Sequence, residues 1–529
     1  MRSGISLTWC ILPWMMAATA CQADGSVPTV GFYKLDDQRL TGETIVIGDK
    51  GGFSDLTVLV TIDTKGKVTA ATSADNYQNL DPTPALSLIH GWTFRPQEFD
   101  GKPVNVVGRV SVTYRERPIP LDTSIAFPKD DLPNTSIILE RGACYGNCPD
   151  YRVTVRGNGL VEFDTGDDHF KGTAAQVHLE YNGHNVLLPG RHTAQIDPAL
   201  VARLMKRFQA AHFFGLKKEY VYGATDNPTQ VLTVRIGKKS KTVTDYIGTQ
   251  ARMPQEVRDL EEAVDTVAGT ARWVYGNTQT LSELDAAHFD YRSPAGTKLV
   301  IAAASKLNDY RPPHDVELLI AGLIDRGVPL DAKMNGASIG TTLVQVAARQ
   351  GREALFEKLT DQRALAAMPR SALNAAFTNV GCSPKIARAL VNAGADPHAV
   401  SDSGTALTSL RGSAASCEEH PDKMLEMART LIALGVPLEA RDSLGWTALM
   451  GCDSPELAEL LLAHGADPKA RAKDGTTPVL ATDDDRVALV LLRAGADPRG
   501  HNDQGTVRSS AVKGPWPATL AWLDEHSIQ

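Results

Sequence analysis

The sequence predicts a multidomain protein in which a small α/β-sheet domain and a second α+β domain precede an all-α solenoid. Three observations support this fold class. The chain has 529 residues, which is too many for one hydrophobic core. Two regions of the first half alternate apolar and polar residues around glycine turns, as β-hairpins do. In the second half a unit of about 30 residues recurs, which is typical of stacked helix pairs.

The composition is that of an ordinary globular protein, with 43% hydrophobic and 22% charged residues. The formal net charge of −8 provides no long-range attraction to nucleic acid or to anionic lipid. We therefore expect no nucleic-acid partner. Membrane contact is expected only through the N-terminus.

Residues 1–20 are expected to be a signal peptide. Arg2 precedes the uncharged stretch from Ile5 to Ala20, whose last residues are small. This is the layout of a secretory signal. The stretch is short for a membrane-spanning helix, although an uncleaved anchor remains the alternative.

The cysteine after this segment suggests a lipid anchor. Ala18-Thr19-Ala20-Cys21 resembles the lipobox of bacterial lipoproteins, although Ala18 stands where the family usually has leucine. The resemblance implies that Cys21 is acylated and becomes the new N-terminus. With Gln22 next, it implies attachment to the outer membrane on the periplasmic side. Ordinary cleavage just before the cysteine, or after Ala23, is the alternative.

Residues 30–117 are expected to form the first folded domain. The stretch Leu56–Ile62 alternates, a turn containing Gly66 follows, and the pattern then resumes. A short helix is expected over Ala85–His90, and a last strand over Val104–Tyr114.

Two phrases in this domain are specific. Trp92-Thr93-Phe94-Arg95-Pro96 and Asp100-Gly101-Lys102-Pro103 lie in this order between the helix and the last strand. Residues 52–117 thereby resemble the C-terminal domain of TonB-type proteins. The resemblance implies docking of an extended peptide on an open sheet edge. The chain has no proline-rich spanning stretch, so energy transduction is not expected.

Residues 134–274 are expected to form an α+β domain. Its expected elements are a strand at Ser136–Arg141, a hairpin from Tyr151 to Phe163, a helix after Asp197, a hairpin around Gly237 and a closing helix over Pro254–Val267. The segment Arg141–Pro149, the block Phe213–Leu216 and Thr225-Asp226 resemble an exported bacterial domain family of unknown function. That resemblance implies a fold and no activity.

Cys144 and Cys148 are the first candidate site of this domain. Three residues separate them, in a loop with Gly146 and Pro149 flanked by strands. Thioredoxin-type redox pairs have two intervening residues at a helix N-terminus. We therefore interpret the pair as a structural disulfide, with a redox pair as the alternative.

A metal site is a second hypothesis for the same domain. His169, His178, His184 and His192 lie close together in the sequence, near Asp167-Asp168. Their spacings match no zinc motif, and histidines in loops are usually solvated. We expect no metal.

The repeated unit of the second half is marked by its glycines. Gly-Ala-Asp-Pro occurs at Gly394, Gly465 and Gly495, and the variant Gly-Val-Pro-Leu at Gly327 and Gly435. Each follows an apolar helical segment. The glycine is therefore expected to end the second helix of its unit in a left-handed cap.

This turn followed by two antiparallel helices resembles the ankyrin repeat. The resemblance covers residues 285–529, with an atypical final cap at Trp516–Asp524. It implies a binding surface. The Thr-Pro-Leu-His phrase of the family is degenerate here and the units are short. We therefore expect an irregular but continuous array.

Three cysteines recur at one place in successive units, the junction between the two helices: Cys382, Cys417 and Cys452. Stacked units lie about 10 Å apart, which is too far for a disulfide between rigid positions. Cys417 lies in the insertion Ser413–Asp422 and could reach either neighbour. A disulfide between two of the three, and three reduced buried thiols, both stay open.

The turn tips of the array are the candidate partner-binding residues. Three successive tips carry the basic residues Arg441, Lys469, Arg471, Lys473 and Arg499. Trp446 lies beside the first of these tips and is of a type enriched in binding hot spots. An acidic protein or peptide would be the complementary partner. Solvated turns without a partner are the alternative.

These features together predict an exported protein-binding scaffold that is not an enzyme and needs no cofactor. The sequence contains no Gly-x-Ser-x-Gly, His-Glu-x-x-His or phosphate-loop motif. The acidic clusters Asp167-Asp168 and Asp483-Asp484-Asp485 are interpreted as solvated turns. The alternative function is a cell-envelope enzyme or redox protein centred on the middle domain.

Overall fold

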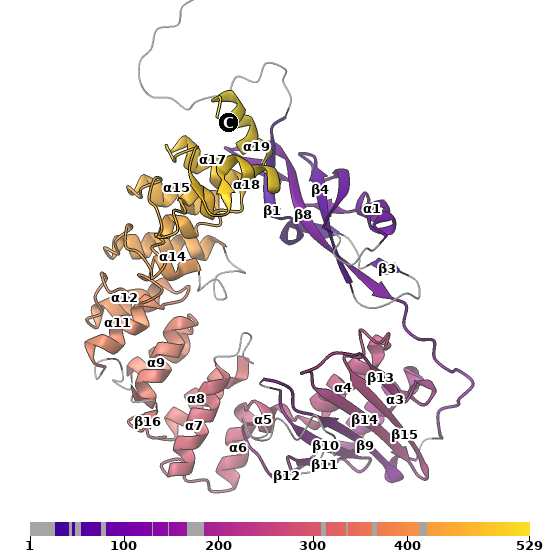
Figure 1. Ribbon diagram of the computed structural model, residues 1–529. Coiled ribbons are helices and arrows are strands. Elements are labelled where there is room, and N and C mark those ends of the chain that lie inside the picture. Colours follow the sequence, from indigo (N-terminus) through magenta and orange to yellow (C-terminus); the bar gives the residue numbers. More distant parts are fainter. Residues whose placement is uncertain are drawn as a thin grey trace, which may run out of the picture.

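The structure is a computed structural model with a sheet-rich first half and a helical second half (Figure 1). It describes residues 27–41, 45–47, 54–75, 81–129, 131–146, 148–166, 185–307, 314–334, 337–361, 365, 368–411 and 421–528. The expected signal peptide and Cys21 lie outside the described residues.

The first domain is a sheet of order β1-β8-β4-β5, with β3 and β7 also paired to β8. Its elements are β1 (Thr29–Lys34), η1 (Asp36–Gln38), β2 (Arg39–Thr41), β3 (Ile45–Ile47), β4 (Ser54–Ile62), β5 (Val68–Asp75), α1 (Thr83–Ile89), β6 (Thr93–Phe94), β7 (Gln97–Phe99) and β8 (Lys102–Glu116). The predicted hairpin, helix and last strand are therefore present. Trp92 and Phe94 are buried in the core beside Ile89 of α1.

The middle domain is a sheet of order β12-β11-β10-β9-β14-β15-β13. Its elements are η2 (Leu132–Asn134), β9 (Thr135–Arg141), β10 (Tyr151–Arg156), β11 (Leu160–Asp164), β12 (Arg191–Gln195), α3 (Pro198–Ala210), η3 (Phe213–Gly215), β13 (Glu219–Val221), β14 (Thr229–Ile236), β15 (Lys239–Tyr246), α4 (Gln255–Ala268) and α5 (Ala271–Val274). Both predicted hairpins and both predicted helices are present. α3 packs against α4, and α4 lies on β9 and β10.

The helical half follows the short helix α6 (Thr278–Ala286) and consists of consecutive helix pairs. In chain order the pairs are α7 (Pro294–Lys306) with α8 (His314–Asp325), α9 (Ile339–Arg349) with α10 (Glu353–Asp361), α11 (Arg370–Thr378) with α12 (Pro384–Asn392), η4 (Thr408–Arg411) with α14 (Pro421–Ala433), η5 (Ala448–Gly451) with α15 (Pro455–Ala463), α16 (Pro478–Ala481) with α17 (Asp485–Arg493), and α18 (Val507–Lys513) with α19 (Pro517–Glu525). Among the first members of the later pairs, η4, η5 and α16 have four residues each, whereas α18 has seven. Consecutive helix pairs of unequal length are compatible with a helical repeat.

The pairs are stacked in sequence order. From α8 to α19, each second helix packs against the second helix of the next pair. One continuous apolar core runs through the stack, and it includes Leu319, Leu390 and Leu491. The short hairpins β16–β17 (Lys333–Met334 and Ala337–Ser338) and β18–β19 (His501–Asn502 and Gly505–Thr506) lie in turns between pairs.

The marker glycines end the second helices as predicted. Gly327, Gly394, Gly435, Gly465 and Gly495 all have φ between 83° and 107°. A residue with a Cβ is strained in this region, so glycine is required there to end the helix.

The array curves so that its two ends meet the two sheet domains (Figure 1). At the start of the array, Leu187 of the middle domain belongs to the array core, and Lys306 Nζ donates to the Asn185 carbonyl at 3.0 Å. At the far end, α17 and α19 pack on β1 of the first domain. The chain therefore closes on itself.

A buried carboxylate joins the far end of the array to the first domain. Asp485 is 0% exposed and accepts hydrogen bonds from the backbone N–H groups of Gly31 (2.8 Å), Ala518 (3.0 Å) and Thr519 (2.8 Å). The approach is close enough that a Cβ on Gly31 would lie 1.7 Å from the carbonyl oxygen of Pro515. We call this contact the Asp485 clasp.

The clasp overturns the interpretation of Asp483-Asp484-Asp485 as a solvated turn. Asp484 caps α17 and pairs with Arg486 at 2.6 Å, and both it and Asp485 are buried. This contact leaves no local sequence pattern, because the partners of Asp485 are backbone groups, one of which lies 454 residues away. Asp167-Asp168 lie outside the described residues.

None of the described helices is both long enough and apolar enough to span a bilayer.

Candidate functional site

A row of polar residues crosses four neighbouring strands of the middle-domain sheet. Tyr151 of β10 lies opposite Arg141 of β9, which lies opposite Gln230 of β14, which lies opposite Asp245 of β15. Residues directly opposite each other share one face of a sheet. The same face carries the apolar core residue Leu139, so the row lies at the end of the core and not on the outer surface.

Helix α4 places Asp265 over this row. Its Oδ2 accepts from Arg141 Nε at 2.8 Å and Nη2 at 2.7 Å, and its Oδ1 accepts from the hydroxyls of Tyr151 at 2.7 Å and Thr270 at 2.8 Å. The side chains of Arg141 and Asp265 are each 20% exposed. The carboxylate therefore has four donors, and its charge is neutralised locally. Burial and the neighbouring Asp265 raise the pKa of Tyr151.

Glu261 lies one turn earlier on α4 and is 3% exposed. Its Oε1 has no hydrogen-bond partner among the described residues. Burial, and then the nearby Asp245 carboxylate, raise the pKa of Glu261 to about 8. Burial also raises the pKa of Asp245, whose Oδ1 accepts from Gly248 N at 2.6 Å. The raised pKa favours the protonated form of Glu261 at pH 7.

A cavity of about 610 Å³ opens beside the Arg141–Asp265 pair. Its floor contains Tyr151, Arg141 and Gln230 from the sheet, and its walls come from the end of α4 and from the start of α6. Cys148 and Pro149 form part of its rim. We call it the α4 cavity.

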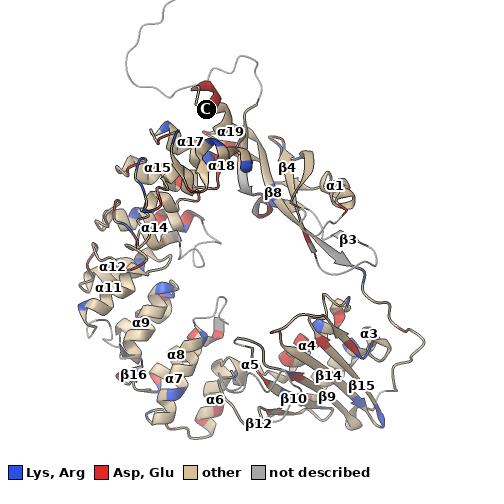
Figure 2. Cartoon of the chain, viewed as in Figure 1, with Lys and Arg blue, Asp and Glu red and all other residues tan. Residues whose placement is uncertain are grey.

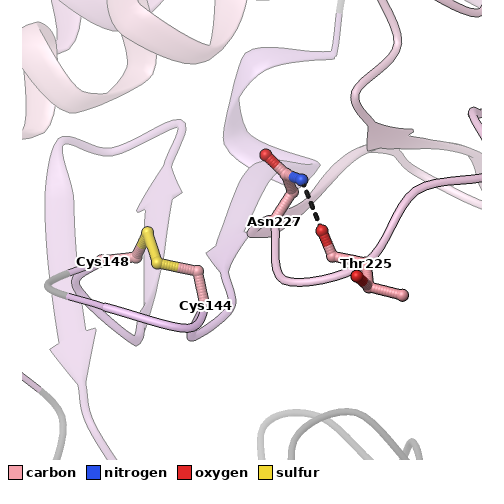
Figure 3. The surroundings of a disulfide bond; sticks show 4 residues. All are labelled: Cys144, Cys148, Thr225 and Asn227. Atoms are coloured by element: carbon pink, nitrogen blue, oxygen red, sulfur yellow. Dashed lines mark hydrogen bonds between the residues drawn. A yellow bond between two sulfur atoms is a disulfide. The ribbon is translucent and has the colours of Figure 1, made fainter. Parts of the chain in front are cut away.

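The predicted disulfide between Cys144 and Cys148 is present, with a Cα–Cα distance of 5.5 Å. A turn at Thr225–Asn227 lies beside the loop, and Asn227 Nδ2 donates to the Thr225 carbonyl at 2.7 Å (Figure 3). The backbone N–H of Tyr145 donates to the Asp226 carbonyl at 3.3 Å. The disulfide therefore holds a loop that forms part of the rim of the α4 cavity.

The predicted partner-binding residues lie on turns of the array. Those that are exposed are Arg441, Lys469, Arg471, Lys473 and Arg499. Two of them support neighbouring turns. Arg441 Nη1 donates to the Gly445 carbonyl of its own turn at 3.0 Å and to the Arg471 carbonyl of the next turn. Lys473 Nζ donates to the Ser443 carbonyl of the preceding turn at 2.7 Å. Arg471 lies 3.5 Å from Asp497.

Trp446 is half-buried, so less of its ring is available to a partner than the sequence suggested. It packs against a small apolar cluster of Met450, Ala470 and Ala472. Met450 lies in η5, whereas Ala470 and Ala472 lie in the turn that precedes α16. The indole therefore holds adjacent units together.

The two described cysteines of the array, Cys382 and Cys452, differ in oxidation state. Cys452 is a buried free thiol, and burial raises its pKa. Cys382 is disulfide-bonded to a residue outside the described part of the chain. The alternative in which Cys382, Cys417 and Cys452 are all reduced is therefore excluded. Cys417 lies outside the described residues.

Only His192 of the four candidate metal-binding histidines lies within the described residues. His169, His178 and His184 lie outside the described residues. His192 is on β12, where its Nε2 lies 3.1 Å from the Leu188 carbonyl oxygen. Among the described residues, His, Cys, Asp and Glu side chains do not gather in threes as metal ligands would.

The two outer strands of the first-domain sheet differ in whether helices of the array cover them. β1 is covered by α17 and α19, which leaves β5 as the other edge of the β1-β8-β4-β5 order. Side chains of β5 such as Thr69 and Thr72 are exposed.

The comparisons with known proteins concern the middle domain. Residues 135–268 match the family described as Domain of unknown function (DUF6438). The match contains Arg141, Tyr151, Asp265 and both cysteines of the loop, and it ends before the α6 wall of the cavity. No curated protein matches the chain.

Sequence reasoning missed the polar row. The sequence pattern predicts only that Arg141 ends a strand and that Tyr151 begins a hairpin. A signal was nevertheless present on α4, where the acidic residues Glu261 and Asp265 are spaced by one turn close to the apolar positions Leu260 and Val264. Acidic residues beside a buried stripe indicate a buried polar network.

Proposed function

We propose that the chain is an exported protein-binding scaffold whose helical half is an ankyrin-type array. Stacked helix pairs, second helices ended by glycine, and hairpin turns between pairs all support this interpretation. Such an array presents an extended surface because each unit contacts mainly its neighbours. A protein or peptide is the class of partner that fits such a surface.

The observation that carries the proposal is a line of exposed cationic residues on successive turns. We call Lys469, Arg471, Lys473 and Arg499 the cationic turn row. Positive and negative residues are interspersed over the molecule (Figure 2), and the same turns also carry the exposed acidic residues Asp467, Asp474 and Asp503. The net charge is −8. Lys469 and Arg499 form no side-chain ion pair within the described residues, so both remain available to an acidic partner.

The first domain supports a second docking role. Its TonB-like sequence phrases and its sheet are compatible with binding by strand addition. Because α17 and α19 cover β1, an added peptide would pair with β5.

Export, and a lipid anchor at Cys21, complete the proposal. They place the scaffold in the periplasm, at the outer membrane.

Charge reversal in the turn row tests the proposal. The double variant Lys469→Glu/Arg499→Glu should bind its partner roughly tenfold more weakly, a loss of about 1.4 kcal/mol. The matched control is Lys423→Glu/Arg429→Glu, which reverses two exposed charges on α14. Affinity capture from cell-envelope extracts, followed by titration of the captured protein, makes the comparison.

Both variants should melt at the wild-type temperature, because the exchanged side chains are exposed. Equal binding by the wild type and the turn variant would remove the cationic turn row from the interface. The β5 edge would then become the candidate surface.

A further inference from the structure

The α4 cavity has the size and position of a ligand site. Its volume of about 610 Å³ is within the range of small-molecule sites, roughly 300–1,000 Å³. It lies where the middle domain meets the start of the helical half, and domain junctions commonly hold ligands. The cavity is independent of the cationic turn row.

The charged groups of the cavity are already paired. Arg141 and Asp265 line it, and they are bound to each other through two nitrogen–oxygen contacts of 2.7 and 2.8 Å. Both oxygens of Asp265 are occupied by donors, two of them the hydroxyls of Tyr151 and Thr270. A charged ligand would enter without an opposite charge free to receive it. The cavity therefore favours a neutral ligand.

The remaining polar lining consists of amides and hydroxyls. Gln230 and Gln279 each supply a side-chain amide, and Asn277 supplies its amide N–H groups because its carbonyl caps α6. Thr266 supplies a hydroxyl oxygen, whose proton is donated to the Glu262 carbonyl at 2.8 Å. The side-chain carbonyl of Asn277 accepts from Gln279 N at 2.9 Å at the start of α6. Such groups donate and accept hydrogen bonds together, and hydroxyl groups of a ligand do the same. A polyhydroxylated ligand matches this lining.

Apolar surfaces lie between these polar groups. Pro149, Pro228 and Tyr275 are also among the residues that line the cavity. Sugar rings present C–H faces between their hydroxyls, and such faces pack on aromatic and proline surfaces. Neutral polar groups interleaved with rings are the lining that a saccharide needs.

A peptide fits the cavity less well. Extended peptides obtain most of their affinity from an open strand edge. At this cavity β9 is paired on both sides, with β10 and β14, and β10 is paired with β9 and β11. The cavity floor therefore offers a peptide no backbone to pair with.

We propose that the α4 cavity of the middle domain binds an uncharged saccharide. The amides of Gln230 and Gln279 contact its hydroxyls, and the Arg141–Asp265 pair forms the polar end of the site. The disulfide loop at Cys148 closes one side.

Isothermal titration of the full mature chain tests this proposal. The probes are the neutral trisaccharides chitotriose, cellotriose and maltotriose, with trigalacturonate as the charged sugar and trialanine as the peptide. At least one neutral trisaccharide should bind, and trigalacturonate and trialanine should bind at least tenfold more weakly. Absence of binding by all three neutral sugars at millimolar concentration would overturn the proposal. Preferential binding of the charged sugar or of the peptide would also overturn it.

Two variants, Gln279→Trp and Gln230→Ala, test whether the sugar binds in the α4 cavity, and Gln209→Trp is the control. Gln279→Trp, at an exposed position of the wall, should fill the cavity and abolish binding, whereas Gln209→Trp on the exposed side of α3 should bind as the wild type does. Gln230→Ala removes one amide without filling the cavity and should weaken binding at an unchanged melting temperature. Wild-type affinity in both Gln279→Trp and Gln230→Ala would show that the sugar binds elsewhere.

Discussion

At the scale of single residues, Glu261 should make the stability of the middle domain depend on pH. Its folded-state pKa of about 8 is higher than the ordinary value of 4.5 for a glutamate. The folded state therefore holds a proton that the unfolded state releases. By linkage, stability contributed by this group is present below about pH 4.5 and is lost as the pH rises through 8.

The Glu261→Gln variant should therefore become more stable relative to the wild type as the pH rises. Relative to the wild type, the variant should gain up to about 1.4 kcal/mol of unfolding free energy per pH unit between pH 5 and 8, because glutamine releases no proton. Urea titrations at several pH values measure this. Glu262→Gln, at the exposed neighbouring position, is the control and should show no such trend. A pH-independent difference between Glu261→Gln and the wild type would contradict the raised pKa.

At the scale of elements, the loop between Cys144 and Cys148 is held by its disulfide. The loop is short, so the disulfide should contribute roughly 2 kcal/mol by restricting the unfolded chain. The double variant Cys144→Ser/Cys148→Ser should lose about that amount in denaturant unfolding. Peptide mapping without reductant should show the two cysteines joined, and free alkylation of both in native protein would refute the disulfide.

The regular elements were largely predictable because their signals are local. The hairpins β10–β11 and β14–β15 follow alternation and glycine turns, and α3 begins at Asp197, whose side chain accepts from Ala199 N at 2.8 Å. Strands β1 and β3 were missed. Both pair in parallel with β8, and parallel pairing depends on distant residues that leave no local pattern.

The candidate site was not predictable for the same reason. Arg141, Gln230 and Asp245 come together only through strand register, and Asp265 reaches them only because α4 folds back over the sheet. The loop cysteines were found because their spacing is itself a sequence signal. The turn-tip cations were likewise visible in the sequence, but their contacts with neighbouring turns were not.

At the scale of the whole molecule, the Asp485 clasp closes the chain. Three backbone N–H groups from β1 and α19 converge on this carboxylate. Arg493 adds an ion pair of 2.7 Å with Asp100 and lies over Phe99. The first domain thereby caps the end of the array, whose terminal units would otherwise expose core residues.

Asp485→Ala should open this contact. Removing the carboxylate leaves three buried donors without an acceptor, at a cost of roughly 3 kcal/mol. Hydrogen exchange should accelerate at Gly31 and at the start of α19, and the radius of gyration from small-angle X-ray scattering should increase. Asp483→Ala, at an exposed position nearby, should change neither quantity. Unchanged exchange in Asp485→Ala would mean that the clasp does not hold the first domain.

The most direct measurement of the scaffold function is site-specific photo-crosslinking in the intact cell envelope. A photoreactive residue is placed at Lys469 or Arg499 of the cationic turn row, or at Lys423 on α14 as the control. We expect one discrete crosslinked protein from each turn position and none from the control position. Crosslinks that are absent from the turn positions, or equal at all three positions, would contradict the claim that this surface binds a partner.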